Sequence, residues 1–284
     1  MKRISRGLNQ TLTLAVVLLL QFVVSAPVLA EEEKPTAAFS VSTLTKYASR
    51  GYENTRDSIV VQPSLTVCYQ GFSANIWGNL DTRPYTPTPG KSYSGTWTET
   101  DSTFSYSKTF GFLNASAGYI YYALDAANTD AAKPLDSQEI YVAIGLNKLL
   151  TPTLTVYKEI DHYHQWYFLL GISHTIEFNK VVSLKLSASA SYLLSEDAST
   201  FPKYNSSSIA TTDKYNNFHD GVISIQLPIN ATKYITMTLT LSYMFPLCDD
   251  AKYEMKGRGL QGTSAPSERD SSFLYGGLTF DFSF

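Results

Sequence analysis

The sequence predicts an all-β fold, a transmembrane antiparallel up-and-down β-barrel of about 12 strands with short periplasmic turns and long extracellular loops. Three observations support this prediction. Apolar and polar residues alternate along most of the chain after residue 38, as in strands with one apolar and one polar face. Most candidate strands are roughly ten to fourteen residues long, which suits a tilted membrane crossing better than a soluble sheet. Long and short connections also alternate, an asymmetry typical of outer-membrane barrels.

The composition agrees with a barrel and excludes several other classes of protein. Of the 284 residues, 13% are aromatic, with 20 Tyr and 15 Phe, and only 17% are charged. Soluble domains carry roughly 25% charged residues. Hydrophobic residues make up 44%, so the chain is neither disordered nor a bundle of transmembrane helices. The net charge of −3 gives no indication of a nucleic-acid partner.

The first 30 residues have the pattern of a cleaved signal peptide. Basic residues lie near the start, an apolar run extends from Leu12 to Val24, and residues 28–30 supply a cleavage site. The apolar run is too short for a membrane-spanning helix, which needs about 20 residues. We therefore expect residues 1–30 to direct export and residues 31–284 to form the outer-membrane β-barrel.

The strands follow from the alternation, which is clearest at the C-terminus. There Leu278, Phe280, Phe282 and Phe284 alternate with small or polar residues. The expected strands are about 38–48, 58–69, 72–82, 97–109, 112–124, 138–148, 153–161, 166–177, 181–194, 218–229, 235–247 and 271–284. No segment after the leader shows the period of an amphipathic helix, so we expect no helix in the barrel.

The connections predict the orientation of the barrel. The long links are 49–57, 83–96, 125–137, 195–217 and 248–270, with 162–165 as a short exception on the same side. The links on the other side are tight turns, so the long loops are expected to be extracellular and both termini periplasmic. A soluble β-sandwich would also alternate, but it would not explain the strand lengths or the loop asymmetry.

The two cysteines fall at opposite ends of this arrangement. Cys68 is expected at the periplasmic end of its strand and Cys248 at the extracellular end of another. A disulfide requires the two Cα atoms to lie within about 7 Å. We therefore expect no disulfide.

Three stretches resemble known proteins. Leu278 to Phe284 (LTFDFSF) is similar to the C-terminal signature of bacterial outer-membrane proteins, and Tyr47 to Tyr52 (YASRGY) and Gly71 to Asn79 (GFSANIWGN) resemble an uncharacterised family of proteobacterial outer-membrane barrels. The resemblance implies a Gram-negative outer membrane, recognition by the barrel-assembly machinery, and contact with outer-membrane lipid and lipopolysaccharide. It implies no catalytic residues.

Charged residues near the expected mouth are the main candidate site. The expected lumen and mouth charges are a basic arc of Lys46, Arg50, Arg56 and Arg83, an acidic arc of Glu139, Glu159 and Asp161, and Lys185 in the middle of the lumen. Opposed arcs would set up a transverse field that orients polar solutes. Alternatively these are rim charges paired locally, Arg83 with Asp81 and Arg56 with Asp57.

The candidates for catalysis are weak. Asp161, His162 and His164 form an acid–histidine cluster, but two histidines are too few for a zinc site. Ser173 and His174 are adjacent and face opposite sides of a strand, which does not make a triad. We therefore expect no enzyme, no metal and no cofactor.

These features favour a narrow, passive, porin-like channel for small polar or charged solutes. The interior of a twelve-stranded barrel is intermediate in width between that of an eight-stranded barrel, which side chains fill, and that of an open porin. Bulky side chains expected in the lumen would narrow it further: Trp77, Tyr141, Tyr157, Tyr167 and Tyr275. The alternatives are a structural or surface-interaction barrel that binds through loops 195–217 and 248–270, and an outer-membrane hydrolase.

Overall fold

The computed structural model describes residues 34–55, 58–83, 95–124, 136–257 and 270–284. All described elements belong to one unit, Pro35–Phe284. The expected signal segment, residues 1–30, lies outside the described residues. Within the described part of the chain, no helix is both long and apolar enough to cross a membrane.

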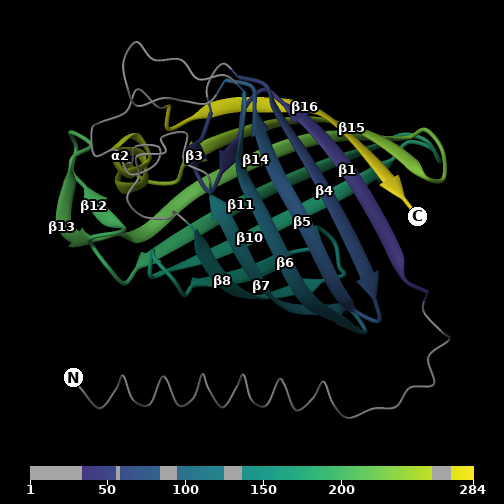
Figure 1. The fold of residues 1–284 in the computed structure, drawn as a ribbon, viewed down its shortest axis with the longest axis horizontal. Helices are drawn as coiled ribbons and strands as arrows, with labels where there is room; N and C mark the ends of the chain where they lie inside the picture. The colour runs from purple at the N-terminus through teal and green to yellow at the C-terminus, as the bar shows by residue number, and fades with distance from the viewer. Residues whose placement is uncertain (1–33, 56–57, 84–94, 125–135, 258–269) are drawn as a thin grey trace. The chain divides into compact units, whose positions relative to one another are not determined.

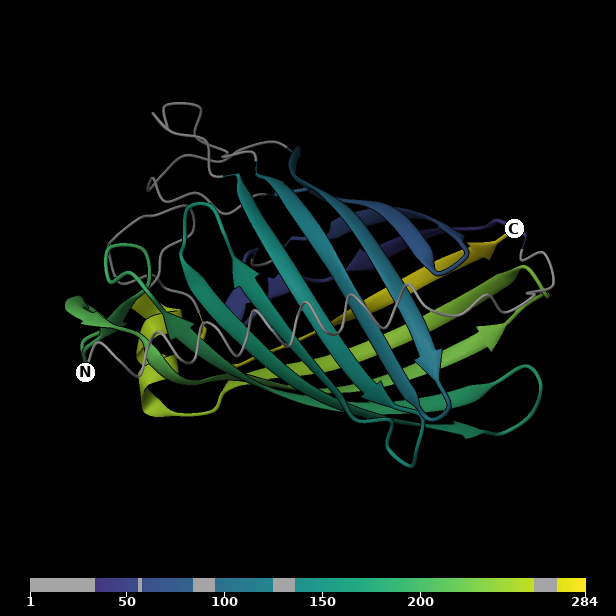
Figure 2. The same cartoon turned by 90° about the horizontal axis from the view of Figure 1, so that it is seen from below.

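Twelve antiparallel strands close into a barrel, in which each strand pairs with its neighbours in the chain and the first pairs with the last (Figures 1 and 2). The barrel strands are β1 (Thr36–Leu44), β4 (Val60–Tyr69), β5 (Phe72–Asp81), β6 (Thr96–Phe110), β7 (Leu113–Leu124), β8 (Ser137–Leu146), β9 (Thr153–Glu159), β10 (Gln165–Glu177), β11 (Ser183–Ser195), β14 (Asn216–Asn230), β15 (Ile235–Pro246) and β16 (Phe273–Ser283). The predicted fold class is confirmed, and every expected strand is present with its ends shifted by a few residues.

Smaller elements lie in the long connections. They are the hairpin of β2 (Ala48–Ser49) and β3 (Tyr52–Glu53), the hairpin of β12 (Pro202–Tyr204) and β13 (Ala210–Lys214), and the helix α2 (Asp249–Gly257). The helix α2 lies in a connection outside the barrel, where the sequence shows no helical period. The helix has only 9 residues, too few to show a clear period, although Asp249 and Asp250 in its first turn and Lys256 in its last suit the helix dipole.

The outer face of the barrel is apolar. Outward side chains from six different strands are between 44% and 58% exposed: Leu65, Phe104, Val142, Leu170, Ile225 and Leu241. Soluble monomers rarely expose a continuous apolar surface of this kind. A band of such residues around a closed barrel is the feature that faces lipid in outer-membrane proteins.

The inner face is polar and bonded across neighbouring strands. Asn75 Nδ2 donates to Ser64 Oγ at 2.8 Å, and the hydroxyls of Ser224 and Ser242 lie 2.7 Å apart. Because inner and outer residues alternate along each strand, the sequence pattern sets both faces at once.

The two ends of the barrel differ. Tight turns and both ends of the described unit lie at one end, where the backbone N–H of Phe284 donates to the carbonyl of Ala37 at 2.8 Å. We call this the short-turn end, and we call the opposite end, which carries the β2–β3 hairpin, the β12–β13 hairpin and α2, the mouth. Cys68 lies at the short-turn end of β4 and Cys248 follows β15 at the mouth, and both are free.

Candidate functional site at the barrel mouth

The linker between β1 and β4 folds into the barrel instead of projecting from it. Leu44 at the end of β1 pairs with Val60 at the start of β4, so the linker has no distance to span and is free to form the β2–β3 hairpin. Its turn contains Arg50 and Gly51, with φ angles of 46° and 88°. The side chains of the hairpin contact several inner walls of the barrel, as the next paragraphs show, and these contacts place the hairpin in the mouth.

Arg50 holds the hairpin tip to the opposite wall. Its Nη1 and Nη2 atoms donate to Glu139 Oε1 and Oε2 on β8 at 2.5 and 2.6 Å. The guanidinium carbon also lies 4.8 Å from the ring centroids of Tyr157 and Tyr167. Burial disfavours the charged guanidinium, but the Glu139 carboxylate outweighs burial and raises the pKa of Arg50 well above its usual value. Arg50 is therefore a partly buried, permanently charged clamp on the buried Glu139.

The start of the linker is fixed to a second wall. The Tyr47 hydroxyl donates to Glu99 Oε2 on β6 at 2.7 Å, and its ring lies 5.7 Å from the ring of Trp77 on β5. Lys46 Nζ lies 2.5 Å from Glu53 Oε1 within the hairpin. The linker is thus bonded to the inner wall at both β6 and β8.

A third contact forms through a β-bulge in β14. The pairing of β11 with β14 shifts between Ala190 and Tyr192, so that Ser191 faces two residues, His219 and Asp220. Both of these consecutive side chains are buried, His219 at 0% exposed and Asp220 at 2%. A regular strand would have turned one of them outward.

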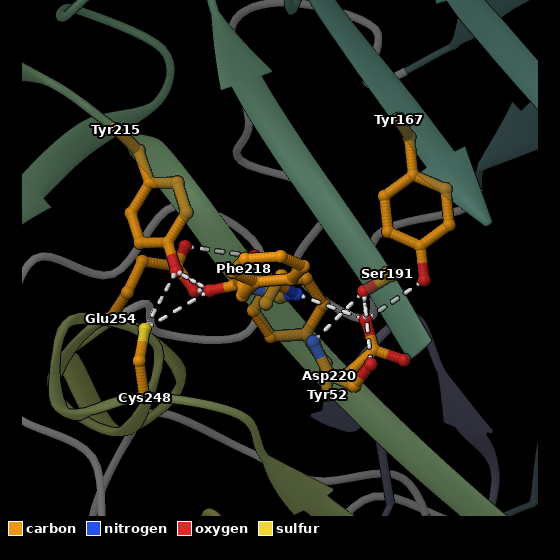
Figure 3. A network of polar contacts seen from close by, with 9 residues as sticks. Tyr52, Tyr167, Ser191, Tyr215, Phe218, Asp220, Cys248 and Glu254 are labelled. Carbon is orange, nitrogen blue, oxygen red and sulfur yellow. Dashed lines mark hydrogen bonds and ion pairs between the residues drawn. The ribbon is translucent and has the colours of Figure 1, made fainter. Parts of the chain in front are cut away.

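His219 connects the helix α2 to the wall, where Asp220 lies beside Ser191 and Tyr167 (Figure 3). Its Nδ1 lies 3.0 Å from Asp220 Oδ1 and its Nε2 lies 3.0 Å from Glu254 Oε2 on α2. The hydroxyl of Tyr52 in the hairpin donates to Glu254 Oε1 at 2.8 Å. A Cβ atom added to Gly51 would lie 3.0 Å from His219 Cε1, so glycine is needed where the hairpin passes the ring.

The same cluster includes a serine, but it is not a catalytic triad. Ser191 Oγ and the Tyr167 hydroxyl both donate to Asp220 Oδ1, at 2.6 and 2.8 Å. A nucleophilic serine would need its hydrogen bond to the histidine. The cluster is a buried structural bridge between β10, β11, β14, α2 and the hairpin.

The predicted basic residues fall in different places. Lys46 and Arg50 belong to the hairpin segment, as described above. Arg83 is exposed just after β5, and its backbone N–H donates to Asp81 Oδ1 at 2.9 Å. Arg56 lies outside the described residues. Lys185 faces the lumen on β11, between Thr175 of β10 and Gln226 of β14.

The predicted acidic residues are also divided. Glu139 faces the lumen and contacts Arg50 directly, so these two charges form a pair instead of facing each other across an open channel. Glu159 is 1% exposed and accepts hydrogen bonds from four consecutive backbone N–H groups, from residue 161 to residue 164. It therefore organises the β9–β10 turn. The transverse field across the lumen stays a prediction.

The histidine cluster lies in that turn. Asp161 follows the end of β9, and its Oδ1 lies 3.3 Å from His162 Nδ1. The two side chains meet because the chain is a turn here, whereas in a strand they would face apart. His162 is 44% exposed, which fits a solvated rim. Among the described residues, no group of three or more metal-ligating side chains comes together.

The bulky residues expected in the lumen continue the wall of the site. The rings of Tyr141 and Tyr157 lie 5.6 Å apart, and those of Tyr157 and Tyr167 lie 6.1 Å apart. Tyr275 on β16 is opposite Ser242 on β15, whose side chain also faces inward. Two of these rings, those of Tyr157 and Tyr167, lie against Arg50 of the hairpin.

Comparisons with known proteins support the fold. No family model matches the chain, and no curated protein matches it. The structure is similar to that of the NanC porin, with a TM-score of 0.51 and 10% identity over 86% of this chain and 98% of that one. Weaker likenesses include LpxR from Salmonella typhimurium (TM-score 0.48, 8% identity, 88% of this chain and 99% of that one) and an outer membrane channel from Pseudomonas putida F1 (TM-score 0.42, 9% identity, 92% and 100%). At this identity the likeness to NanC establishes the barrel fold alone.

Proposed function

We propose that this protein is an outer-membrane channel for small polar or charged solutes, and that the β2–β3 hairpin closes its mouth in the conformation described here. The observation that carries the proposal is the hairpin itself. It occupies a lumen whose walls are polar, and it is held there by side-chain contacts without a covalent bond. A barrel that needed only a filled interior could use its own wall side chains, as smaller barrels do.

The outer membrane is the proposed location because the apolar outer face requires lipid. The leader-like first 30 residues and the aromatic C-terminus support export and recognition by the barrel-assembly machinery. In this orientation the mouth faces the cell exterior, in contact with lipopolysaccharide, and the short-turn end faces the periplasm.

The closed state is proposed to be reversible because the hairpin can leave without disturbing the barrel. Leu44 and Val60 pair with each other whether or not the linker lies inside. Beneath the hairpin the inner face is rich in Ser, Thr and Asn, which can hydrate a passing solute, and Lys185 adds a positive charge there. A solute would therefore cross a polar, wet path once the hairpin moves.

Conductance in planar bilayers tests this proposal. We would compare the full protein with a variant in which residues 46–58 are replaced by a four-residue Gly-Ser turn joining β1 to β4. The variant is expected to show larger or more frequent conductance steps than the unchanged protein. A matched control shortens the tip of the β12–β13 hairpin, residues 205–209, which lies in another loop. If the linker variant folds, as judged by heat-modifiable gel mobility, and conducts no more than the unchanged protein, the proposal is wrong.

A surface-interaction barrel is the second candidate, and one observation favours it. The loops at the mouth have a packed core in which Phe201, Tyr215, Ala251 and Met255 are at most 4% exposed. An ordered loop platform of this kind suits recognition of a partner at the cell surface. If the linker variant does not conduct but replacing residues 205–209 abolishes a surface phenotype, this second function would be favoured.

A further inference from the structure

The short-turn end carries a second feature, a group of lysines next to exposed aromatic rings. Lys108 Nζ lies 5.5 Å from the ring centroid of Phe110, and Lys148 Nζ lies 5.1 Å from that of Phe112. Both aromatic rings are largely exposed, Phe110 at 43% and Phe112 at 57%. The pairs are thus amphipathic units on the outside of the barrel, and they have no part in the site at the mouth.

The two pairs lie side by side on adjacent turns. The backbone N–H of Asn147 in the β8–β9 turn donates to the carbonyl of Phe112 in the β6–β7 turn at 2.7 Å. The side-chain amide of Asn114 donates to Asn147 Oδ1 at 2.7 Å. These bonds hold the two turns together, so the two lysines flank one continuous surface.

Apolar side chains surround this surface and indicate where it lies relative to the membrane. Leu149 is 77% exposed and Leu150 is 44% exposed. Leu150 also has a φ of 65°, an uncommon conformation for a non-glycine residue. Large apolar side chains exposed to this degree are stable in the boundary region of a membrane, where Lys side chains extend their ammonium groups towards the headgroups.

The lysines here lack the carboxylate partners that lysines have at the mouth. At the mouth, Lys46, Lys158 and Lys203 are each within 3.0 Å of a carboxylate oxygen. By contrast, residues 105–118 and 142–155, which contain both turns and the adjoining strand ends, include no Asp or Glu. Among the described residues, neither Lys108 nor Lys148 forms an ion pair. Their positive charge is available to an external anion.

We propose that Lys108 and Lys148, with Phe110 and Phe112, form a binding site for the phosphodiester headgroup of an anionic phospholipid, represented by phosphatidylglycerol. This inference uses the membrane location proposed above and is independent of channel activity. The ammonium groups bind the phosphate, and the rings and leucines lie against the glycerol and upper acyl chains. Lys180 and Lys233 lie in other turns of the same end, and the site is centred on Lys108 and Lys148 because hydrogen bonds join the two turns beside them.

Native mass spectrometry of the purified full-length protein in neutral detergent tests the site. Phosphatidylglycerol and phosphatidylcholine of matched acyl chains are titrated separately. We expect phosphatidylglycerol to reach half-occupancy at an about tenfold lower concentration, since each lysine near a lipid surface contributes roughly a fivefold preference before screening. The double variant K108Q/K148Q should lose this preference, and K108R/K148R should keep it.

The control variant K203Q/K214Q removes the same charge from the mouth and should keep the preference. Equal binding of the two lipids by the unchanged protein, or equal loss of preference in the control variant, would overturn the site. Full displacement of the lipid by millimolar inorganic phosphate would show a free-phosphate site and overturn the lipid assignment. If the protein folded in the absence of both lipid and detergent, as judged by heat-modifiable gel mobility, this result would refute the membrane location instead.

Discussion

Replacing Arg50 by Gln should open the mouth of the barrel. In the structure the guanidinium makes two hydrogen bonds to Glu139, at 2.5 and 2.6 Å, and lies over the rings of Tyr157 and Tyr167. Gln is shorter and uncharged, so it keeps at most one of these interactions. The variant leaves Glu139, which is 2% exposed, without its cation while the hairpin is in place.

The magnitude follows from the burial of this pair. Removing one partner of a buried ion pair costs about 3–5 kcal/mol, because the remaining charge is buried without compensation. A hydrogen bond from the Gln amide would recover about 1 kcal/mol of this. A net loss of roughly 3 kcal/mol changes the ratio of closed to open hairpin by about 100-fold, since each 1.4 kcal/mol is about tenfold. A channel that is open about 1% of the time would become open about half of the time.

Single-channel recording measures this directly as open probability. The matched control is Lys158→Gln, which breaks an ion pair with Glu196 of the same 2.5 Å length at the outer rim. There Glu196 is 47% exposed, so the loss should be at most about 1 kcal/mol and opening should not change. If Arg50→Gln folds and its open probability equals that of the unchanged protein, the Arg50–Glu139 ion pair does not hold the channel closed.

A double-mutant cycle isolates the interaction energy between Arg50 and Glu139 from the effects of their other contacts. Glu139→Gln alone should also open the mouth, because it leaves the partly buried guanidinium of Arg50 without its anion. The double variant R50Q/E139Q contains neither charge and should close better than either single variant, with a coupling energy of roughly 2–3 kcal/mol. Additive effects of the two single changes would contradict direct coupling between these residues.

Three further predictions concern the hairpin and the rim. Gly51→Ala should favour opening by about 1–3 kcal/mol, measured as open probability, because its Cβ would lie 2.6 Å from Met255 Cε at a φ of 88°. Glu159→Gln should lower the thermal midpoint of unfolding, followed by circular dichroism, with unchanged conductance, because an amide nitrogen cannot accept the backbone hydrogen bonds of the β9–β10 turn. The hydrogen bond from Lys158 holds the pKa of Glu196 below its usual value, so Lys158→Gln should raise that pKa in an NMR titration. Because the folded-state pKa is the lower one, the small stability that this pair adds is present above the unfolded-state pKa and is lost as the pH falls through the folded-state value.

The strands were predictable because the barrel imposes one simple rule on the sequence. Each strand has a lipid face and a lumen face, so its residues alternate along nearly all of its length, and long runs such as Ile235–Pro246 show this clearly. The same rule puts Glu139 on the inner face, where the structure shows it bonded to Arg50. The rule says nothing about what the lumen contains, and the hairpin that pairs with Glu139 comes from a segment without alternation.

The cluster around His219 was missed for a definite reason. Strict alternation places His219 and Asp220 on opposite faces, whereas the bulge opposite Ser191 turns both inward. Glu254, the third member, lies on a helix of 9 residues in a loop where the sequence shows no helical period. The Arg50–Gly51 pair was a usable indication of the hairpin, because an Arg-Gly step between short polar segments suits a turn with positive φ.

The distribution of charge fits a hairpin that closes the proposed channel and can still be released. Three carboxylates, those of Glu99 and Glu139 on the wall and that of Glu254 on α2, accept hydrogen bonds from Tyr47, Arg50 and Tyr52 of the linker. In the closed state these carboxylates are buried and each contact is strong. When the hairpin leaves, water enters the same space and solvates the carboxylates, so the open state does not retain the cost of buried, unpaired charge. The free-energy difference between the closed and open states is then small, because it is the difference between large opposing contributions. Three buried carboxylates around one hairpin suit the proposed gate, balanced within a few kcal/mol, and single substitutions at Arg50 or Glu139 are expected to shift that balance.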